Sequence, residues 1–433
     1  MTAWLSIIGV GETGVAALPP AMRALVLAAE TVLGPARLLA TTVSPARHEQ
    51  GGSSLDPRAV QEAKPTQPVG GPAASAAADL VPWAASLPAM LEQVLARRGT
   101  PTVILATGDP MWFGIGATLA RHLPSEEFTI YPAPGAFQLA AARLRWPLQH
   151  AATLSLHGRA VETLHPHVLP GNRVLALTSD RSTLTDAAKL LIGRGYGESR
   201  LVILEHLGGA DERLSDTTAA AFDPAGIGDF HVLAIDCVAD AEAALLPPVP
   251  GLPDGAFVSD GQLSKREIRA ATLAGLAPYP GALLWDVGAG CGSVAIEWLR
   301  AARDARALAF ERNAARRDTI ATNARALGTP GLEIIAGDAP GSLAGHASPD
   351  AVFMGGDVAN VALFEACWRA LRPGGRLVAN AVTLDGEAAL YARQERLGGE
   401  LVRLEIAVLD HIGGAERVLR PRLPVTQWLA VKP

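Results

Sequence analysis

The glycine-rich segment 288–292 is the part of the chain whose residue types most directly indicate ligand binding. It lies between the apolar run 283–287 and an apolar, helix-like stretch at 293–299. Glycines let a ligand approach the backbone where side chains would clash, and the first N–H groups of a helix are free to bind it. The sequence therefore predicts a strand–turn–helix unit that binds a nucleotide-type cofactor. The expected contacts in the turn are Gly288, Ala289, Gly290, Cys291 and Gly292.

Three carboxylates accompany this turn. Asp286 lies two residues before the first glycine, Glu311 follows Gly290 by 21 residues, and Asp338 ends the next expected strand. A carboxylate about 20 residues beyond a glycine turn typically binds ribose hydroxyls. Ligands of open α/β sheets bind at the carboxyl ends of the strands. We therefore expect Glu311 to bind a ribose, Asp338 to reach an adenine amino group, and Asp286 to contribute to the same cofactor site.

Two polar turns in the first half also suit a ligand cleft. Gly9 and Gly11 follow the apolar run 4–8, and Gly108 and Asp109 follow the run 102–106. The Asp-Pro pair at 109–110 forces a turn after the strand and leaves a polar edge. A turn that holds no ligand remains an equal alternative for the segment 9–14.

Alternating apolar strands and helices must position these residues, so the chain is expected to be an α/β protein. In the first half we expect helices near 19–30 and 84–98 and further strands at 128–132, 173–178, 200–205 and 230–236. In the second half a helix at 264–276 precedes strands at 282–287, 306–310, 332–336, 350–354, 375–380, near 401–409 and at 425–431.

The alternation is interrupted twice, and these interruptions predict the domain organisation. Residues 44–79 are rich in Pro, Gly, Ser, Gln and Ala and show no hydrophobic period, which indicates a flexible insertion. Residues 245–256 contain four prolines and two glycines and indicate a linker. We therefore predict a first domain over 1–244, a proline-rich linker over 245–256 and a second domain over 257–433.

Composition excludes several classes of protein. The 433 residues carry a formal net charge of -6, which argues against a generic nucleic-acid binder. Three scattered cysteines give neither a disulfide framework nor a metal spacing, so no metal site is expected. The amino-terminal sequence is not typical of a signal peptide, and no apolar run is long enough to cross a membrane. We therefore expect a cytoplasmic protein.

The motifs of the second half together resemble class I S-adenosylmethionine-dependent methyltransferases. A nicotinamide dehydrogenase is the alternative, but the turn is G-x-G-x-G rather than G-x-G-x-x-G. The later segments 355–357 and 372–375, Gly-Gly-Asp and Arg-Pro-Gly-Gly, also fit a methyltransferase better. The resemblance implies a Rossmann-like sheet, with Ser264 and Ala339 as further cofactor contacts.

The first half resembles the tetrapyrrole methylases. The resemblance rests on the turn 8–14, on Thr-Gly-Asp-Pro-Met-Trp-Phe-Gly at 107–114, and on Tyr-Pro-Ala-Pro-Gly at 131–135. It implies two small α/β subdomains with S-adenosylmethionine in the cleft between them. Gly108 and Asp109 would then lie beside the cofactor, whereas Gly9 and Gly11 would line the substrate side.

The two halves in one chain resemble the bifunctional, decarboxylating corrin-ring methyltransferases of cobalamin biosynthesis. This implies two S-adenosylmethionine sites, a tetrapyrrole substrate methylated at two meso carbons, and loss of carbon dioxide from a ring acetate. Substrate contacts are expected from Gly355, Gly356, Arg266 and Arg269, besides Gly9 and Gly11. No catalytic side chain is assigned, and Glu267 and His411 are candidates for handling protons.

Several expectations depend on this combination. The arginines of the first domain should be concentrated in its cleft, because an acidic domain must accept a polyanionic ring. A homo-oligomer is expected. The alternatives are a methyltransferase for RNA or another small molecule, and a scaffold that binds S-adenosylmethionine but has partly lost catalysis. The sequence does not distinguish a metal-free from a cobalt-containing substrate.

Overall fold

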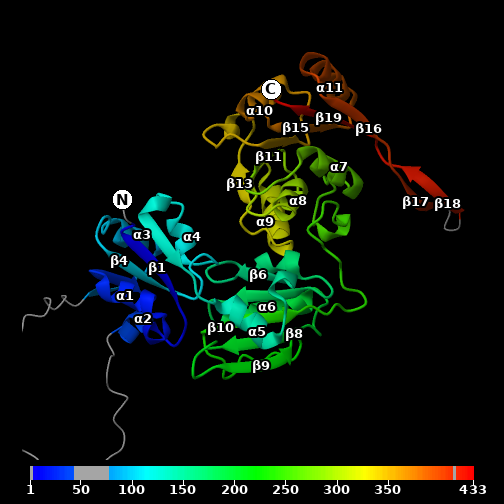
Figure 1. Ribbon diagram of the computed structural model, residues 1–433. Coiled ribbons are helices and arrows are strands. Elements are labelled where there is room, and N and C mark those ends of the chain that lie inside the picture. Colours follow the sequence, from blue (N-terminus) through cyan, green and yellow to red (C-terminus); the bar gives the residue numbers. More distant parts are fainter. Residues whose placement is uncertain (1–2, 43–77, 413–415) are drawn as a thin grey trace, which may run out of the picture.

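The computed structural model describes residues 3–42, 78–412 and 416–433. Three α/β units follow one another along the chain, each built on its own sheet, and a two-stranded hairpin projects from the last of them (Figure 1). Most of the predicted insertion 44–79 lies outside the described residues, although Asp79 begins a strand. The mixed α/β architecture confirms the predicted fold class.

The first unit is a parallel sheet with the order β3-β2-β4-β1-β5. Its strands are β1 (Leu5–Val10), β2 (Thr31–Gly34), β3 (Asp79–Pro82), β4 (Thr102–Thr107) and β5 (Phe128–Tyr131). Its helices are α1 (Pro20–Ala28), α2 (Ala36–Leu39), α3 (Leu87–Leu95) and α4 (Ile115–Leu119). Because Val10 of β1 is in register with Thr107 of β4, the two polar turns that follow these strands share one edge of the sheet.

The second unit is a mixed sheet with the order β6-β7-β10-β8-β9, in which only β6 and β7 pair in parallel. Its strands are β6 (Ala151–Ser155), β7 (Arg173–Leu177), β8 (Arg200–Glu205), β9 (Arg213–Thr218) and β10 (His231–Asp236). Helix α5 (Ala136–Leu144) packs on one face and α6 (Arg181–Gly193) on the other. The sequence prediction missed β6 and β9, of which β9 is a polar, exposed edge strand.

The third unit is a seven-stranded sheet with the order β13-β12-β11-β14-β15-β19-β16. Its strands are β11 (Leu283–Val287), β12 (Arg306–Glu311), β13 (Glu333–Ala336), β14 (Ala351–Met354), β15 (Arg376–Ala381), β16 (Glu400–Leu404) and β19 (Val425–Val431). The first five are parallel, and β19 is antiparallel to both β15 and β16. The parallel strands place their carboxyl ends at one edge, where ligands of such sheets bind.

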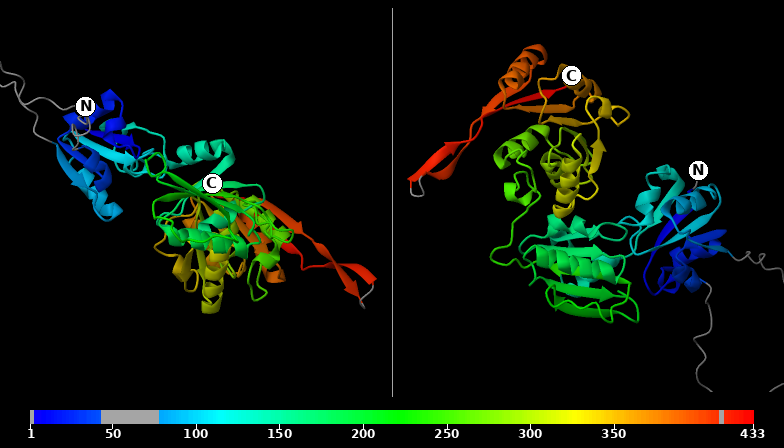
Figure 2. Two further views of the ribbon diagram at one scale, coloured as in Figure 1. Left: turned by 90° about the horizontal axis from the view of Figure 1, so that it is seen from below. Right: turned by 180° about the vertical axis from the view of Figure 1, so that it is seen from behind.

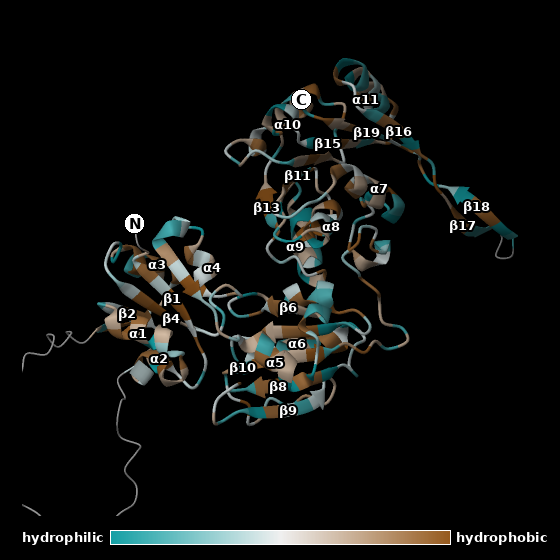
Figure 3. Ribbon diagram, viewed as in Figure 1, coloured by the Kyte–Doolittle hydropathy of each residue, from teal (hydrophilic) through white to brown (hydrophobic). Residues whose placement is uncertain are grey.

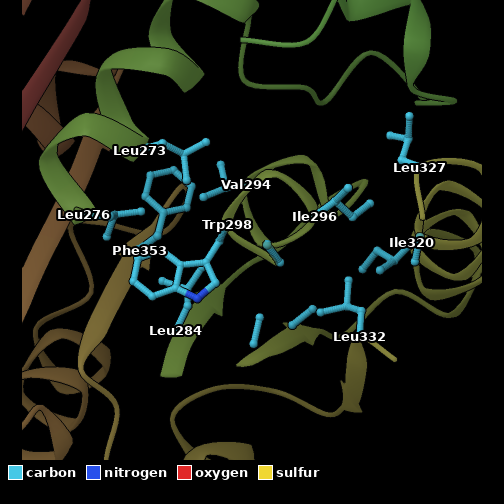
Figure 4. Packing of buried hydrophobic residues seen from close by; sticks show 14 of the residues in the cluster. Leu273, Leu276, Leu284, Val294, Ile296, Trp298, Ile320, Leu327, Leu332 and Phe353 are labelled. Carbon is cyan, nitrogen blue, oxygen red and sulfur yellow. The ribbon is translucent and has the colours of Figure 1, made fainter. Parts of the chain in front are cut away.

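Helices cover both faces of the third sheet. They are α7 (Arg266–Leu276), α8 (Ser293–Ala301) and α9 (Ala314–Ala326) on one face and α10 (Val361–Ala370) and α11 (Leu384–Leu397) on the other. Trp298 of α8 is fully buried between Leu284 of β11 and the α7 side chains Leu273 and Leu276 (Figure 4). Truncating a buried aromatic side chain of this size to alanine destabilises a fold by about 3–5 kcal/mol.

The single strand expected near 401–409 is wrong. The chain instead leaves the sheet after β16 and forms a hairpin of β17 (Ala407–Ile412) and β18 (Glu416–Pro421), which projects away from the third unit (Figures 1 and 2). Most residues of both strands are exposed. Elsewhere, central strands such as β1 and β4 consist mainly of hydrophobic residues (Figure 3).

Two arginines fix the connection between the second and third units. Arg194, after α6, donates to the carbonyl of Ala244 at 3.2 Å, and the buried Arg300 of α8 donates to the carbonyl of Leu246 at 2.5 Å. Leu246 and Leu252 are buried in the core of the third unit. The predicted linker is therefore held against the third unit rather than suspended between domains.

A half-buried imidazole lies at the same junction. His165 belongs to a short helix, η5 (Val161–His167), and the added Cβ of an alanine at Gly328, just after α9, would meet Pro166 of that helix. Burial and the charges of Arg194 and Arg300 lower the pKa of His165 to about 4.

Among the described residues no helix is long and apolar enough to cross a membrane.

Candidate functional site

A cavity of about 920 Å³ opens at the carboxyl ends of the parallel strands of the third sheet. Gly288, Ala289 and Gly290 of the glycine turn line it, as do Ser264 and Glu311. The sequence predicted all five as cofactor contacts. The fold brings them together because β11 and β12 are neighbours in register, so that the turn after one strand faces the acid that ends the other.

The backbone of the turn requires glycine. Gly288 and Gly290 have φ angles of 74° and 60°, in the region that side chains disfavour. The N–H of Gly290 donates to Oε2 of Glu311 at 2.9 Å, and the N–H of Asn313 donates to Oε1 at 2.9 Å. A carboxylate offers about four acceptor positions, so each oxygen of Glu311 retains one for a ligand hydroxyl. The carboxylate is therefore oriented by the turn that it serves.

Asp286 lies beneath the turn and not on the cavity wall. It is 1% exposed, and its Oδ2 accepts a hydrogen bond from the N–H of Ala295 in α8 at 3.0 Å. Its Oδ1 has no hydrogen-bond partner among the described residues. Burial, opposed by the Ala295 hydrogen bond and reinforced by the charge of Glu311, raises the pKa of Asp286 from 3.8 to about 7. This geometry ties the end of β11 to the start of α8.

The other two turn residues also lie off the wall. Cys291 is 3% exposed, and burial raises the pKa of its thiol. A Cβ added to Gly292 would stand 2.9 Å from Cγ2 of Ile320 in α9. These positions therefore allow the turn to pack against its neighbouring helix.

The wall opposite the turn is formed by later strand ends. Asp338 and Ala339 follow β13, and Gly355 and Gly356 follow β14; all four line the cavity. The Asp338 side chain is 79% exposed and lies 3.7 Å from Nη1 of Arg312. It stands at the rim of the cavity, where it is accessible to a ligand group.

Arg269 was predicted as a substrate contact, and the structure contradicts this. Its side chain is wholly buried in α7, where Nε donates to Oε1 of Glu297 at 2.6 Å. The guanidinium also donates to the carbonyls of Ser264 and Leu252 and lies 4.7 Å from the centre of the Phe257 ring. Leaving the charge of Glu297 buried without its partner would cost several kcal/mol, on the order of 3–5. Arg269 thus holds the segment that carries Ser264.

The remaining predicted side chains lie away from the cavity wall. Arg266 pairs with the neighbouring Glu267 at 2.7 Å, and neither lines the cavity, although Glu267 reaches Nη1 of Arg422 at 3.2 Å. His411 lies on the projecting hairpin, exposed and opposite Arg417. Its position on the hairpin removes it from the cavity, because the chain leaves the sheet before residue 407.

Several lining residues were missed by the sequence analysis. Lys265, just before α7, and Arg422, between β18 and β19, place positive charge on the cavity wall. Asn380 at the end of β15 also lines it and donates to Oγ1 of Thr272 at 2.9 Å, while Gln427 donates to Oδ1 of Asn380 at 2.9 Å. Its position at a strand end was the one sequence signal that could have identified Asn380 as a lining residue, because its hydrogen-bond partners are over 40 residues away in the chain.

A second cavity, of about 550 Å³, lies between the first and second units. Gly11, Gly108 and Asp109 line it, together with residues of the second sheet such as His231. Gly108 has a φ of 65°, and a Cβ there would stand 2.7 Å from Cα of Gly135. This close approach of two turns fits a ligand held by backbone groups.

Gly9, predicted beside Gly11, does not line this cleft. A Cβ at Gly9 would stand 2.2 Å from the carbonyl oxygen of Gly108, so the residue is needed where the two turns touch. Asp109 accepts a hydrogen bond at Oδ1 from the N–H of Met111 at 2.8 Å, which fixes the Asp-Pro turn.

The expectation that arginines gather in the first cleft is wrong. Of the arginines in the described part of the first half, only Arg37 lines it. Half of the others pair with carboxylates elsewhere, in the pairs Arg98–Glu127, Arg143–Glu212, Arg173–Asp236, Arg181–Asp229, Arg200–Asp216 and Arg213–Glu205. The acidic residues of this half therefore neutralise its arginines in local pairs.

Both parts of the chain are similar in sequence to known methyltransferases. Residues 5–223 match the Tetrapyrrole (Corrin/Porphyrin) Methylases, and residues 255–432 match the Precorrin methyltransferase domain. A Sinorhizobium sp precorrin-6Y C(5,15)-methyltransferase [decarboxylating] is 43% identical over 98% of this chain and 95% of its own length. This chain belongs to the precorrin-6Y C(5,15)-methyltransferase family.

Two more precorrin methyltransferases place the chain within this family. The Mycobacterium tuberculosis precorrin-6Y C(5,15)-methyltransferase [decarboxylating] is 41% identical over 80% of this chain and 86% of its own length. A Salmonella typhimurium cobalt-precorrin-6B C(15)-methyltransferase (decarboxylating) is 32% identical over 38% of this chain and 85% of its own length. The relatives are decarboxylating methyltransferases, and S-adenosylmethionine is the methyl donor of this family. The cavity of the third unit fits it: the turn is open to a ligand, and Glu311 has acceptors for ribose hydroxyls.

Proposed function

We propose that the chain transfers methyl groups from S-adenosylmethionine to meso carbons 5 and 15 of precorrin-6B, or of its cobalt form, and decarboxylates the ring C acetate to give precorrin-8. The observation that carries this proposal is the presence of two separate cavities at glycine turns in one chain. Relatives named for both methylations and the decarboxylation match the chain over 80% of its length or more.

The proposal includes one S-adenosylmethionine in each cavity. In the third unit, Glu311 would hold the ribose, the turn 288–290 would face the amino-acid portion, and Asp338 with Ala339 would contact the adenine. In the first cleft, Gly108 and Asp109 would contact the cofactor through the turn after β4. When bound, the cofactor supplies an electrophilic methyl group, and the protein's contribution is to align it with the meso carbon and exclude water.

The cavity of the third unit also suits decarboxylation. Lys265 and Arg422 on its wall would bind peripheral carboxylates through charge-assisted hydrogen bonds. The bond from the acetate methylene to its carboxyl carbon would break, and the electron pair would enter the conjugated imine system of the ring. A proton would then add to the methylene carbon, which becomes a methyl group. The chain's residues must hold the ring so that this bond overlaps with the conjugated system.

We assign C(15) methylation and decarboxylation to the cavity of the third unit and C(5) methylation to the first cleft. A relative that aligns with only 38% of the chain is named for the first two reactions together, which supports placing them in one half. The predicted domains 1–244 and 257–433 would then each hold one methyl-transfer site. The cytoplasmic location, the homo-oligomer and the lack of a nucleic-acid partner stay predictions.

Product analysis tests this function. The purified chain is incubated with S-adenosylmethionine and precorrin-6B, in metal-free and cobalt-loaded forms, and the products are resolved by mass spectrometry. We expect a product that has gained two methyl groups and lost carbon dioxide. Calorimetric titration with S-adenosylmethionine should give two sites per chain. Absence of methylation with either form of the substrate would contradict the proposal.

A further inference from the structure

Arg37 is the only arginine that the described residues contribute to the wall of the first cleft. It lies on α2, and its Nη1 donates to Oε1 of Glu12 in the turn after β1. Its Nη2 donates to Oγ1 of Thr107 at 2.9 Å, at the end of β4. The turns after two neighbouring strands of the first sheet thus fix this guanidinium at the edge of the cleft.

The guanidinium also reaches the second unit. Its carbon lies 4.6 Å from the centre of the Phe230 ring, which lies just before β10, and that ring packs against His206 with 5.6 Å between ring centres. A cation over an aromatic face contributes roughly 0.5–1 kcal/mol at exposed sites. Arg37 therefore lies across the mouth of the cleft, in contact with both of the units that form it.

Arg37 keeps donors for a further acceptor. A guanidinium has five N–H groups, and the described residues take hydrogen bonds from two of its nitrogens, Nη1 and Nη2, with one acceptor each. The side chain is 40% exposed, whereas that of Glu12 is 19% exposed. The planar fork suits a carboxylate better than an ammonium group does. The accessible side of this ion pair is therefore its cationic side.

The wall around Arg37 suits the rest of a flat, carboxylate-bearing ring. Trp112, Phe113 and Phe230 line the cleft and are each close to half exposed. Phe113 is held at a φ of 55°, a conformation that bulky residues rarely adopt and that is concentrated at functional sites. These three rings offer apolar area to the face of a macrocycle.

The charge of the cleft otherwise opposes such a ligand. Glu12, Asp109 and Asp229 line it, with Arg37 as the one arginine among the described lining residues. We propose that Arg37 binds a peripheral carboxylate of the tetrapyrrole in this cleft, and that Glu12 neutralises its guanidinium until that carboxylate displaces Glu12. The proposal rests on the proposed function, because it takes the tetrapyrrole as the ligand.

The two partners of this ion pair should affect substrate binding with opposite signs. Arg37→Ala removes the carboxylate-binding group, so the KM for the tetrapyrrole in the first cleft should rise about ten- to hundredfold. Glu12→Gln removes the competing carboxylate, so the same KM should fall. If the ion pair only supports the fold, the KM should change in the same direction whichever partner is removed.

The experiment uses the full-length protein with precorrin-6B and saturating S-adenosylmethionine, and mass spectrometry separates singly from doubly methylated product. Arg37→Ala should accumulate the singly methylated, decarboxylated product while calorimetry gives unchanged S-adenosylmethionine affinity at both sites. Arg98→Ala is the matched control, because Arg98 forms a similar, partly exposed pair with Glu127 outside the cleft. Its kinetics should match those of the unmodified protein.

Three results would overturn this assignment. An equal rise in KM for Glu12→Gln and Arg37→Ala would make the pair structural. A loss of S-adenosylmethionine affinity in Arg37→Ala with unchanged KM would place Arg37 on the cofactor, and a lower kcat for Glu12→Gln at constant KM would make Glu12 a catalytic group. If the unmodified protein methylates precorrin-6B twice, the proposed function stands whatever these variants do.

Discussion

The two cavities of this chain are built in different ways. The cavity of the third unit lies at the edge of one sheet, where Glu311 and the glycine turn after β11 come from adjacent strands. The first cleft lies between two sheets, so Gly108 of the first and His231 of the second meet only across the cleft. The geometry of the first cleft therefore depends on how two units pack, whereas that of the third-unit cavity depends on strand register within one sheet.

The charges on their walls differ as well. Lys265, Arg312, Arg316 and Arg422 line the third-unit cavity, which suits a substrate with many carboxylates. In the described part of the first cleft, Arg37 is the one arginine among three carboxylates. The two sites must therefore recognise a polyanionic ring by different means, one through several basic residues and the other through an arginine and aromatic faces.

Removing the ribose-binding carboxylate should separate the two sites most completely. In Glu311→Ala the ligand would lose two hydrogen bonds to a charged group, each contributing about 1.5–3 kcal/mol, so affinity at this site should fall a hundredfold or more. Calorimetry should then find one S-adenosylmethionine per chain. Decarboxylation should stop, while the first cleft retains its cofactor.

The control for this variant is Glu333→Ala, which removes an exposed carboxylate from β13 of the same sheet. It should leave the stoichiometry at two. If methylation at both carbons survives in Glu311→Ala, the ribose assignment in the third unit is wrong.

The reciprocal variant is Gly108→Ala, which should weaken only the first site. The new Cβ would stand 2.7 Å from Cα of Gly135 at a φ of 65°, so the two turns must move apart. We expect at least a tenfold loss of S-adenosylmethionine affinity in the first cleft, about 1.4 kcal/mol. Gly158→Ala is closely matched in φ, at 66°, but has no neighbour within 4 Å. Equal losses of affinity in both variants would assign the effect to φ strain alone.

The charge difference between the sites is tested by Arg422→Ala. Arg422 lines the third-unit cavity and is held by Glu267 at 3.2 Å. Losing one charge-assisted contact among several should raise the KM for decarboxylation about three- to tenfold, less than Arg37→Ala in the first cleft. Arg396→Ala, which breaks the exposed pair with Glu365, should leave that KM unchanged. A larger effect at Arg422 than at Arg37 would reverse the comparison.

The smallest effect on activity is expected from Asp286→Asn, whose consequence is a change in pH dependence. The pKa of Asp286 is raised from 3.8 to about 7 in the folded protein, so the folded state binds this proton more tightly than the unfolded state. The contribution to stability is full below about pH 4 and is lost as the pH rises towards 7, by at most ~1.4 kcal/mol per pH unit.

Asparagine keeps an acceptor for the N–H of Ala295 and carries no charge. Urea unfolding measured across this pH window should therefore show a flatter pH dependence for the variant, and no loss of stability at the alkaline end. A variant whose pH profile matches that of the unmodified protein would show that Asp286 is not protonated near neutral pH.

The five parallel strands of the third sheet were all predicted from sequence, whereas β2 and β3 of the first sheet and β6 and β9 of the second were missed. Long apolar runs such as 102–106 and 283–287 can only be buried strands in an alternating α/β pattern, and the structure confirms them. The polar edge strand β9 and the hairpin of β17 and β18 carry no such run. Their position is determined by pairing with distant segments, which a local pattern does not contain.

The sequence by itself determined the glycine turns and the acid that ends the next strand, because each depends on short-range spacing. Only the tertiary structure decided which charged residues face a ligand. Arg269 lies 3.4 Å and Arg422 4.0 Å from the carboxylate of Asp254, yet Arg269 is buried against Glu297 and Arg422 lines the cavity. Burial depends on what packs over a side chain, and in this chain those partners are often more than 20 residues away in sequence.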